Sequence, residues 1–314
     1  MKVVALAGGI GAARFLRGLV RVVALADLTV VANTGDDITL HGLHVSPDLD
    51  TITYTLGGGV HPEQGWGRDG ESFVVADELE QRYGASRWFT LGDRDLATHL
   101  VRTEALRSGE PLSTVTARIA RAWALPFTLL PMTDDPVATR VRTTDGRELH
   151  FQQWWVGEQA ASEVAEVWLE GAAAARPAPG VAEALAAADV VVLCPSNPVV
   201  SIGTILQVPG IRDALAKAMV VGVSPIVGGK VVRGMADKLL PAVGAEVSAL
   251  GVARGYADFL DAWVIDHVDE DQAPAVQDLG AAVAVTDTIM RDERAAELLA
   301  TVCLDLARML AARR

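Results

Sequence analysis

The sequence predicts an α/β protein with a Rossmann-like, doubly wound, mainly parallel sheet that carries a smaller inserted α/β lobe. The chain opens with an apolar strand over residues 2–7, a glycine turn, a helix over 12–25 and a second strand, LTVVAN. This βαβ unit is typical of a parallel sheet. Two later runs, ADVVVLCPSNP and KAMVVGVSPIVGGK, are continuously apolar, as strands buried on both faces are.

A hairpin pattern lies between the N-terminal βαβ unit and these two runs. The segment ATRVRTTDGRELHFQQWWV alternates polar and apolar residues around Asp145-Gly146, which predicts a β-hairpin. We therefore expect a first core segment at 1–134, the inserted lobe at 135–179, and a second core segment at 180–314 that ends in an amphipathic helix over 293–314. Four tryptophans are expected to fill the core: Trp66, Trp88, Trp154 and Trp155.

Composition limits the class of protein. The chain has 314 residues, half of them hydrophobic, which is enough for a large α/β core with a smaller lobe. No apolar run reaches the roughly 18–20 residues of a membrane span, and the first strand meets glycines too early for a signal peptide. Cys194 and Cys303 alone suggest neither a disulfide framework nor a cysteine metal site. We expect a cytoplasmic protein without a membrane partner.

The net charge further limits the kinds of partner that the protein is expected to bind. The chain carries a formal charge of −13, and we find no basic stripe along it. An extended nucleic-acid surface needs such a stripe, so no nucleic acid is expected to bind. An anionic ligand would have to meet locally gathered cations or a metal ion.

The first candidate site is the glycine turn of Gly8, Gly9 and Gly11. Backbone N–H groups at a helix N-terminus favour an anion such as phosphate. Arg14 stands where a dinucleotide fingerprint has its third glycine, and no Gly-Lys-Ser/Thr follows. A tight βα turn without a ligand explains the same glycines, so both interpretations stay open.

The second candidate site is acidic. Asp36, Asp37, Asp48 and Asp50 follow the second strand within fifteen residues. Hard oxygen ligands of this kind suit Mg²⁺, which takes one or two carboxylates and shares phosphate oxygens with a substrate. Alternatively, these aspartates cap a turn and a helix.

Other polar groups stand at predicted strand ends and helix starts. Arg94 is a donor for a phosphate or an oxygen-rich ring, or one half of a surface pair, and His99 is expected to be packed. Further polar residues follow apolar runs: Thr133, Asp134, Ser196, Asn197, Gly229 and Lys230.

Nine segments in order resemble one family, the 2-phospho-L-lactate transferases (CofD/FbiA) of coenzyme F420 biosynthesis. They are LAGGIGAARFL, NTGDD, SPDLDT, LGDRDLATH, LLPMTDDPV, HFQQWWV, PSNPVVSIG, SPIVGGK and RGMADK. The resemblance implies a homodimer. It also implies Mg²⁺-dependent transfer of a phosphorylated three-carbon acid from a guanosine diphosphate ester to the ribityl hydroxyl of 8-hydroxy-5-deazariboflavin (Fo), with release of GMP.

The resemblance also implies roles for residues. Catalysis is expected from Asp48, Asp50 and Arg94, with Asp50 a general base or only a ligand and Arg94 in contact with the deazaflavin. The metal ligands would be Asp37, Asp48 and Asp50. The substrates would meet Asn33; on the guanosine side Gly8, Gly9, Gly11, Ser196, Asn197, Gly229 and Lys230; and at the ring Met132, Thr133 and Asp134.

Alternatives concern the donor and the class of function. The resemblance fits lactyl and enolpyruvyl donors, and HGLHVSPDLDTITYTLGGGV and WWV, which look closer to the actinobacterial branch, favour enolpyruvyl. A non-enzymatic, nucleotide-sugar-binding regulator similar to gluconeogenesis factors would share the glycine turn but needs no deazaflavin pocket. An NAD-dependent oxidoreductase is disfavoured because Asn33 stands near the strand end where a ribose-binding acid usually lies.

Overall fold

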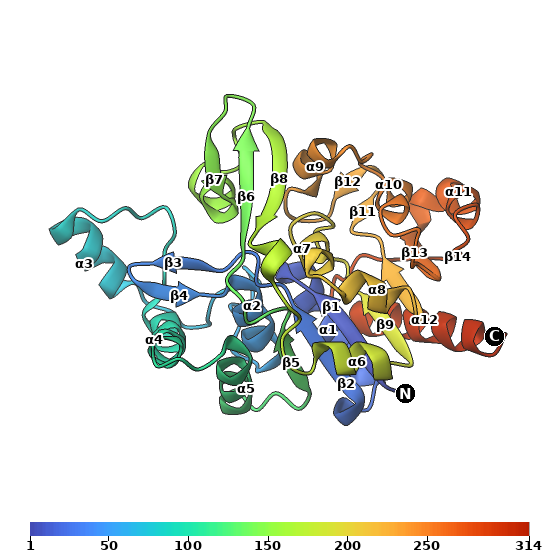
Figure 1. Ribbon diagram of the computed structural model, residues 1–314, viewed down its shortest axis with the longest axis horizontal. Helices are drawn as coiled ribbons and strands as arrows, with labels where there is room; N and C mark the ends of the chain where they lie inside the picture. Colours follow the sequence, from blue (N-terminus) through green and yellow to red (C-terminus); the bar gives the residue numbers. More distant parts are fainter. Residues whose placement is uncertain (314) are drawn as a thin grey trace.

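A seven-stranded sheet runs through the centre of the protein (Figure 1), in a computed structural model that describes residues 1–313. The strand order is β14-β13-β10-β9-β1-β2-β5, and every neighbouring pair is parallel. The strands are β1 (Val3–Ala7), β2 (Leu28–Ala32), β5 (Thr128–Pro131), β9 (Val190–Leu193), β10 (Val220–Val223), β13 (Ala262–Asp266) and β14 (Ala282–Thr286). The predicted doubly wound, parallel α/β fold is confirmed.

Helices cover both faces of this sheet. The α-helices of the described residues are α1 (Gly9–Val22), α2 (Pro47–Leu56), α3 (Val74–Tyr83), α4 (Asp93–Arg107), α5 (Leu112–Ala122), α6 (Val181–Ala187), α7 (Ile202–Gln207), α8 (Ile211–Leu215), α9 (Ala236–Leu239), α10 (Ala249–Arg254), α11 (Ala273–Gln277) and α12 (Glu293–Ala311), of which α3 and α4 project away from the sheet. Val3 and Ala5 of β1 share a core with α1 and α12, whereas Val4 and Leu6 belong to the core on the opposite face. In residues 1–313, no helix is both long and apolar enough to cross a membrane.

A three-stranded antiparallel sheet lies within residues 135–179. Its order is β7-β6-β8, with β6 (Ala138–Thr143), β7 (Glu148–His150) and β8 (Val164–Glu170). Gly146, with φ of 89°, makes the turn between β6 and β7, so the hairpin predicted at Asp145-Gly146 is confirmed. Val141 and Trp154 join the apolar core under the central sheet, so this lobe has no separate core of its own.

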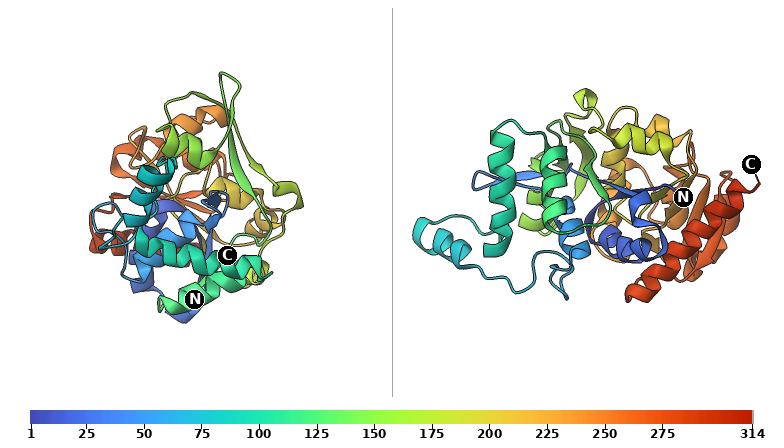
Figure 2. Two further views of the ribbon diagram at one scale, coloured as in Figure 1. Left: turned by 90° about the vertical axis from the view of Figure 1, so that its left-hand side faces the viewer. Right: turned by 90° about the horizontal axis from the view of Figure 1, so that it is seen from below.

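Two short hairpins complete the strands. They are β3 (Ile38–Leu40) with β4 (Leu43–Val45), and β11 (Ile226–Val227) with β12 (Lys230–Val231). The β3–β4 hairpin, α3 and α4 extend away from the central sheet on the side opposite α12 (Figures 1 and 2). Leu40, Val45 and Leu91 form a small apolar cluster there. The first core segment expected at 1–134 includes this projection and does not separate it from the core.

Two sequence-based expectations are corrected. The first helix begins at Gly9 rather than at residue 12 and ends at Val22, because Gly9, with φ of 71°, turns the chain directly from β1 into the helix. Trp154 is fully buried as expected, but the side chain of Trp66 is 48% exposed and does not fill the core. Trp88 and Trp155 are half-buried against apolar clusters.

The closest helix contact in the core joins α1 to α12 at Gly18. A Cβ placed on Gly18 would lie 2.1 Å from the carbonyl carbon of Ala296, so the helices approach backbone to backbone. We expect Gly18→Ala to lower the free energy of unfolding by about 1–3 kcal/mol, because the helices must move apart. Urea denaturation would measure this. Leu298→Ala, at an exposed position on α12, is the control and should change stability by less than about 0.5 kcal/mol; an equal loss in both variants would contradict the prediction.

Candidate active site

The candidate site lies where β1, β2 and β9 end. Gly8 follows β1, Asn33 follows β2, and the loop that contains Ser196 follows β9. Ligands of open parallel sheets bind beyond the carboxyl ends of the strands, near such neighbouring loops. The structure therefore brings together three segments that are distant in the sequence.

The glycines let the chain pass close to the loop after β9. The Gly8 N–H donates to Ser196 Oγ at 3.2 Å. A Cβ on Gly11 would lie 2.3 Å from the carbonyl oxygen of Pro195, so no larger residue fits there without movement of the backbone. Gly9 donates a backbone hydrogen bond to Asp48, so the first turn of α1 already faces a negative group. The turn is both a close-packed βα connection and a place where negative charge collects.

Asn33 joins these segments at the centre of the site. Its Nδ2 donates to Asp48 Oδ2 at 2.9 Å and to the Val200 carbonyl at 3.1 Å. Its Oδ1 accepts from Gly35 N at 2.8 Å and from Thr204 Oγ1 at 2.7 Å. Because the side chain is fully buried and its amide is fully used, Asn33 orients Asp48 and is closed to direct substrate contact in this structure.

Three aspartates form an acidic cluster beside Asn33. Burial, followed by the negative charge of Asp48, raises the pKa of Asp36 well above its usual value. Burial also raises the pKa of Asp37, and it raises the pKa of Asp48 to about 6. Asp36 Oδ1 and Asp37 Oδ1 are buried and have no hydrogen-bond partner within residues 1–313. The cluster is therefore short of positive charge.

Only part of this charge is compensated from outside the cluster. Asp37 Oδ2 accepts from His44 Nε2 at 2.9 Å and from Ser46 Oγ at 2.7 Å. From the lobe, Gln152 Nε2 donates to Asp36 Oδ2 at 3.5 Å. These contacts leave Asp36 Oδ1 and Asp37 Oδ1 without a partner among the described residues, so both oxygens are free to bind a cation.

The segment HFQQWWV places the lobe against this cluster. Burial lowers the pKa of His150 to about 4, so its imidazole is neutral at neutral pH. Its Nε2 donates to the Asp37 carbonyl at 3.1 Å, and its Nδ1 accepts from Gln152 N at 3.1 Å. Both contacts fit the neutral tautomer that carries its proton on Nε2. The lobe is thus fixed to the acidic loop by a histidine that does not change charge.

Asp50 belongs to a second cluster. Arg102 of α4 binds its carboxylate with both terminal nitrogens, one of them at 3.0 Å, and both side chains are buried. His99 lies beside this pair, with Nδ1 3.7 Å from Asp50 Oδ2, and its other ring nitrogen lies 3.2 Å from Asp95 Oδ2. The expectation that His99 is packed is confirmed.

The partners of Asp48 and Asp50 differ because of helix geometry. Residues two apart on a helix are separated by about 200°, so these two carboxylates of α2 point in different directions. Asp48 faces Asn33, whereas Asp50 faces Arg102. The structure gives the two carboxylates different partners, and a shared role of Asp48 and Asp50 at a metal stays a prediction.

The remaining predicted residues differ in accessibility. Arg94 is exposed at the start of α4, where its Nη1 donates to the Asp69 carbonyl at 3.1 Å. Met132 and Thr133 are fully buried, and the Asp134 carboxylate accepts from Ser113 N at 2.6 Å and so caps α5. Contact of these three residues with a deazaflavin ring stays a prediction, and the structure gives Asp134 a structural role.

The structure also shows where two pairs of residues from the expected guanosine side lie. Asn197 Oδ1 accepts from Val199 N at 2.9 Å, which shapes the loop after β9. Gly229 and Lys230 are exposed in the β11–β12 hairpin, and the Lys230 amine has no hydrogen-bond or ion-pair partner in the described part of the chain. No contact joins Lys230 to the glycine turn, so its role with the nucleotide stays a prediction.

Comparison with known proteins identifies the family. A family model described as 2-phospho-L-lactate transferase CofD matches residues 3–304. The chain belongs to the CofD family. The predicted membership is therefore confirmed over nearly the whole chain.

Curated relatives of this CofD-family chain are named phosphoenolpyruvate transferase. One from Kitasatospora aureofaciens is 52% identical and one from Thermobifida fusca is 50% identical, with 98% of each chain covered in both cases. One from Mycolicibacterium smegmatis is 43% identical, over 98% of this chain and 99% of its own length. Among solved structures, a UPF0052-family protein from Bacillus halodurans matches with a TM-score of 0.64 at 15% identity, covering 96% of this chain and 98% of the other. At that identity, the match shows the fold alone.

The charge-poor cluster of this CofD-family chain fits a divalent cation. In residues 1–313, no three carboxylate, imidazole or thiol groups meet closely enough to enclose a metal by themselves. Mg²⁺ commonly takes only one or two carboxylates and completes its shell with water and phosphate oxygens. Two carboxylates of the cluster, rather than all three, would fit such an ion, and its carboxylate oxygens without a hydrogen-bond partner in the described part of the chain are Asp36 Oδ1 and Asp37 Oδ1.

Sequence reasoning missed several residues that the structure brings into the site. Thr204 binds Asn33, and Arg102 neutralises Asp50. Arg102 stands three positions after His99 and seven after Asp95, on one face of a helix, and this spacing could have indicated it. Asp36 was noted in the acidic run but was not assigned to the metal.

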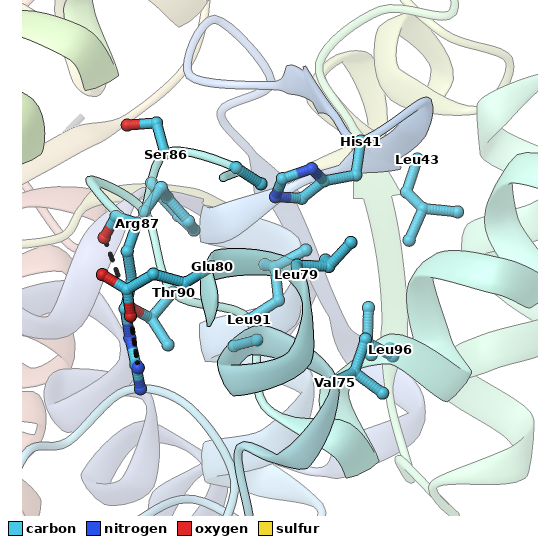
Figure 3. Close-up of a pocket in the computed structure, with 13 residues that line it drawn as sticks. His41, Leu43, Val75, Leu79, Glu80, Ser86, Arg87, Thr90, Leu91 and Leu96 are labelled. Carbon is cyan, nitrogen blue, oxygen red and sulfur yellow. Dashed lines mark hydrogen bonds and ion pairs between the residues drawn. The ribbon is translucent and has the colours of Figure 1, made fainter. Parts of the chain in front are cut away.

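A different pocket lies apart from these residues. It lies between the β3–β4 hairpin and α3 (Figure 3) and is lined mainly by aliphatic side chains, among them Leu43, Val75 and Leu79. Its ion pair joins Arg87 to Glu80 at 3.0 Å. None of the predicted site residues lines it, so we place the chemistry at the carboxyl ends of the strands.

Proposed function

We propose that this CofD-family protein transfers a phosphoenolpyruvyl group from a guanosine diphosphate ester to the ribityl hydroxyl of Fo, in coenzyme F420 biosynthesis. The hydroxyl oxygen forms a bond to the phosphorus that carries the enolpyruvyl group, the bond from that phosphorus to the GMP oxygen breaks, and the hydroxyl proton is released. A phospholactyl ester is the alternative donor. The names of the curated relatives support the enolpyruvyl donor.

The observation that carries this proposal is the buried acidic cluster beside the glycine turn. One or two of the carboxylates Asp36, Asp37 and Asp48 would hold Mg²⁺ together with the donor phosphates. The bound ion would neutralise the charge of the diphosphate. Phosphoryl transfer requires mainly positioning and charge neutralisation, so little covalent chemistry is asked of the protein.

The protein's own groups supply the positioning. Asn33 holds Asp48 toward the site, and the Ser196 hydroxyl holds Gly8 at the start of α1. Asp50, fixed by Arg102, is proposed to orient the acceptor hydroxyl rather than to bind the metal. We further propose that the enzyme works in the cytoplasm as a homodimer, which sedimentation analysis would test.

The test is turnover with purified components. We expect Fo, the enolpyruvyl guanosine diphosphate ester and Mg²⁺ to give dehydro-F420-0 and GMP, with slower turnover of the lactyl ester. EDTA should abolish the reaction and added Mg²⁺ should restore it. Tight binding of a nucleotide sugar, with no product from either ester, would contradict the proposal and favour the regulator.

Arg94 provides a separate prediction for the acceptor. Its guanidinium is exposed at the start of α4, so Arg94→Ala should leave the fold unchanged. We expect the dissociation constant for Fo to rise about tenfold, the cost of losing one charged hydrogen bond. Fluorescence titration with Fo measures this constant. Arg82→Ala on α3, also at an exposed arginine, is the control; equal Fo affinity in both variants would exclude Arg94 from the acceptor site.

A further inference from the structure

A second polar cavity lies along α1, beyond the glycine turn. Its volume is about 280 Å³. It lies between the first turns of α1, the loop over 60–65 and the segment over 290–293 that leads into α12, and Ile10, Arg14, Arg17 and His61 are among its lining residues. None of the residues assigned above to the metal or the acceptor lines it.

Two arginines from different segments converge at the rim of this cavity. Beside Gly65, the position that a Cβ would occupy lies 3.6 Å from Arg233 Nη1 and 3.8 Å from Arg14 Nη2. Arg233 is held there because its Nη2 donates to the Gln64 carbonyl at 2.7 Å. Gly65 itself has φ of 71°, a conformation that suits glycine. The chain thus brings two guanidinium groups to one point and leaves the space beside them open.

These positive charges lack negative partners. The side chains of Arg14 and Arg17 form no ion pair or hydrogen bond with any other residue in 1–313. The carboxylates of the cavity are used elsewhere: Asp292 Oδ1 accepts from Ala295 N at 2.8 Å, and Glu293 pairs with Arg21 at 3.4 Å. Burial and the charge of Arg14 lower the pKa of Arg233. In a chain of net charge −13, two adjacent guanidinium groups that have no ion-pair partner in residues 1–313 indicate an anionic ligand.

We propose that Arg14 and Arg233 bind an oxyanion, a phosphate or a carboxylate, of the nucleotide-linked donor. This inference rests on the proposed function. Arg14 lies five positions after Gly9, the residue that bonds to Asp48, and five residues span about 7.5 Å along the axis of α1. A diphosphate ester of a three-carbon acid is long enough to reach both points. The metal end and the arginine end would then hold the donor across the first turns of α1.

Binding measurements with two variants test this. Arg14→Gln and Arg233→Gln are compared with Arg82→Gln, a control at an exposed arginine of α3 that pairs with Glu78. Inorganic pyrophosphate and GDP are titrated by calorimetry in EDTA, so that metal does not contribute to the signal, and Fo is titrated in parallel. We expect the dissociation constants for pyrophosphate and GDP to rise about tenfold or more in both variants, with Fo affinity unchanged.

The source of the oxyanion follows from the pattern of results. Weaker binding of pyrophosphate and GDP assigns the arginines to the phosphates. Unchanged GDP binding, with a KM for the acid-bearing ester raised about tenfold, assigns them to the carboxylate. Wild-type values for both probes and for that KM in the two variants would overturn the proposal, as would a wild-type protein that binds neither probe.

Failure of the proposed function gives a different result. A wild-type protein that binds pyrophosphate and GDP through these arginines, yet transfers nothing to Fo, would support the oxyanion site and contradict the transferase. Normal transfer to Fo, with unchanged binding of pyrophosphate and GDP and an unchanged KM in both variants, would support the transferase and contradict the oxyanion site. Circular dichroism of each variant excludes misfolding, which the partial exposure of both arginines makes unexpected.

Discussion

Asp48→Asn should lower kcat roughly 100-fold or more while making the free protein more stable. The loss of activity follows because the variant removes the carboxylate that Asn33 orients toward the site. The gain in stability follows because that carboxylate is buried and near the charge of Asp37, which keeps its pKa raised to about 6. A residue with a purely structural role would lose stability together with activity.

The gain in stability expected for Asp48→Asn follows from how the stability of the wild type depends on pH. A carboxyl group with a folded pKa of about 6, against 3.8 when unfolded, holds its proton more tightly in the folded state. Stability of the free protein should therefore fall as pH rises from about 4 to about 6, by roughly 3 kcal/mol from this group. Urea denaturation across this range, with Asp48→Asn and wild type compared, measures the contribution of Asp48 together with its effect on Asp36, whose pKa the Asp48 charge raises.

Mg²⁺ provides a further check on the same variant. Added Mg²⁺ should raise the melting temperature of the wild type, because an ion that binds only the folded state stabilises it, and should have little effect on Asp48→Asn. Asp213→Asn, at an exposed position on α8, is the control and should behave as wild type. Full activity of Asp48→Asn with normal Mg²⁺ dependence would exclude Asp48 from the site.

Asp50→Asn should have a large effect of the opposite sign on stability. The substitution leaves the Arg102 guanidinium buried beside an uncharged partner, and breaking a buried ion pair in this way costs about 3–5 kcal/mol. Denaturant unfolding would measure the loss. A loss below about 1 kcal/mol would show that water or another anion reaches Arg102.

A double variant separates the stability role of Asp50 from a role in the reaction. Replacing both partners with apolar residues, as in Asp50→Leu with Arg102→Met, should recover most of the lost stability because no unpaired charge stays buried. If Asp50 orients the acceptor hydroxyl, the double variant should fold and remain inactive. Recovery of activity along with stability would show that the pair serves only the fold.

The fold was predictable because its signals are local. The central strands β1, β9 and β10 show their burial in short apolar runs, and the Asp145-Gly146 turn encodes its own hairpin. The glycine turn and the acidic run can also be located from the sequence, because both stand at the ends of apolar strands. These features need no knowledge of distant partners.

The arrangement within the site was less predictable because it depends on direction and on distant partners. Asp48 and Asp50 look equivalent in SPDLD, and only the helical rotation of α2 sends one to Asn33 and the other to Arg102. Arg102 lies fifty-two positions from its partner, and nothing near Asp50 in the sequence marks it. The burial of Met132 likewise depends on how the lobe packs against the sheet.

The contact between Gly18 and Ala296 also constrains how the chain acquires its structure during synthesis. The apolar face of α1 is made early, but the helix that covers it, α12, is made after every strand of the central sheet. β1 likewise pairs with β9, whose partner residues lie far along the chain. Such non-local pairing is slow, and it leaves hydrophobic surface exposed on the growing chain. We therefore expect ribosome-bound chains that stop before residue 293 to remain protease-sensitive and to recruit chaperones.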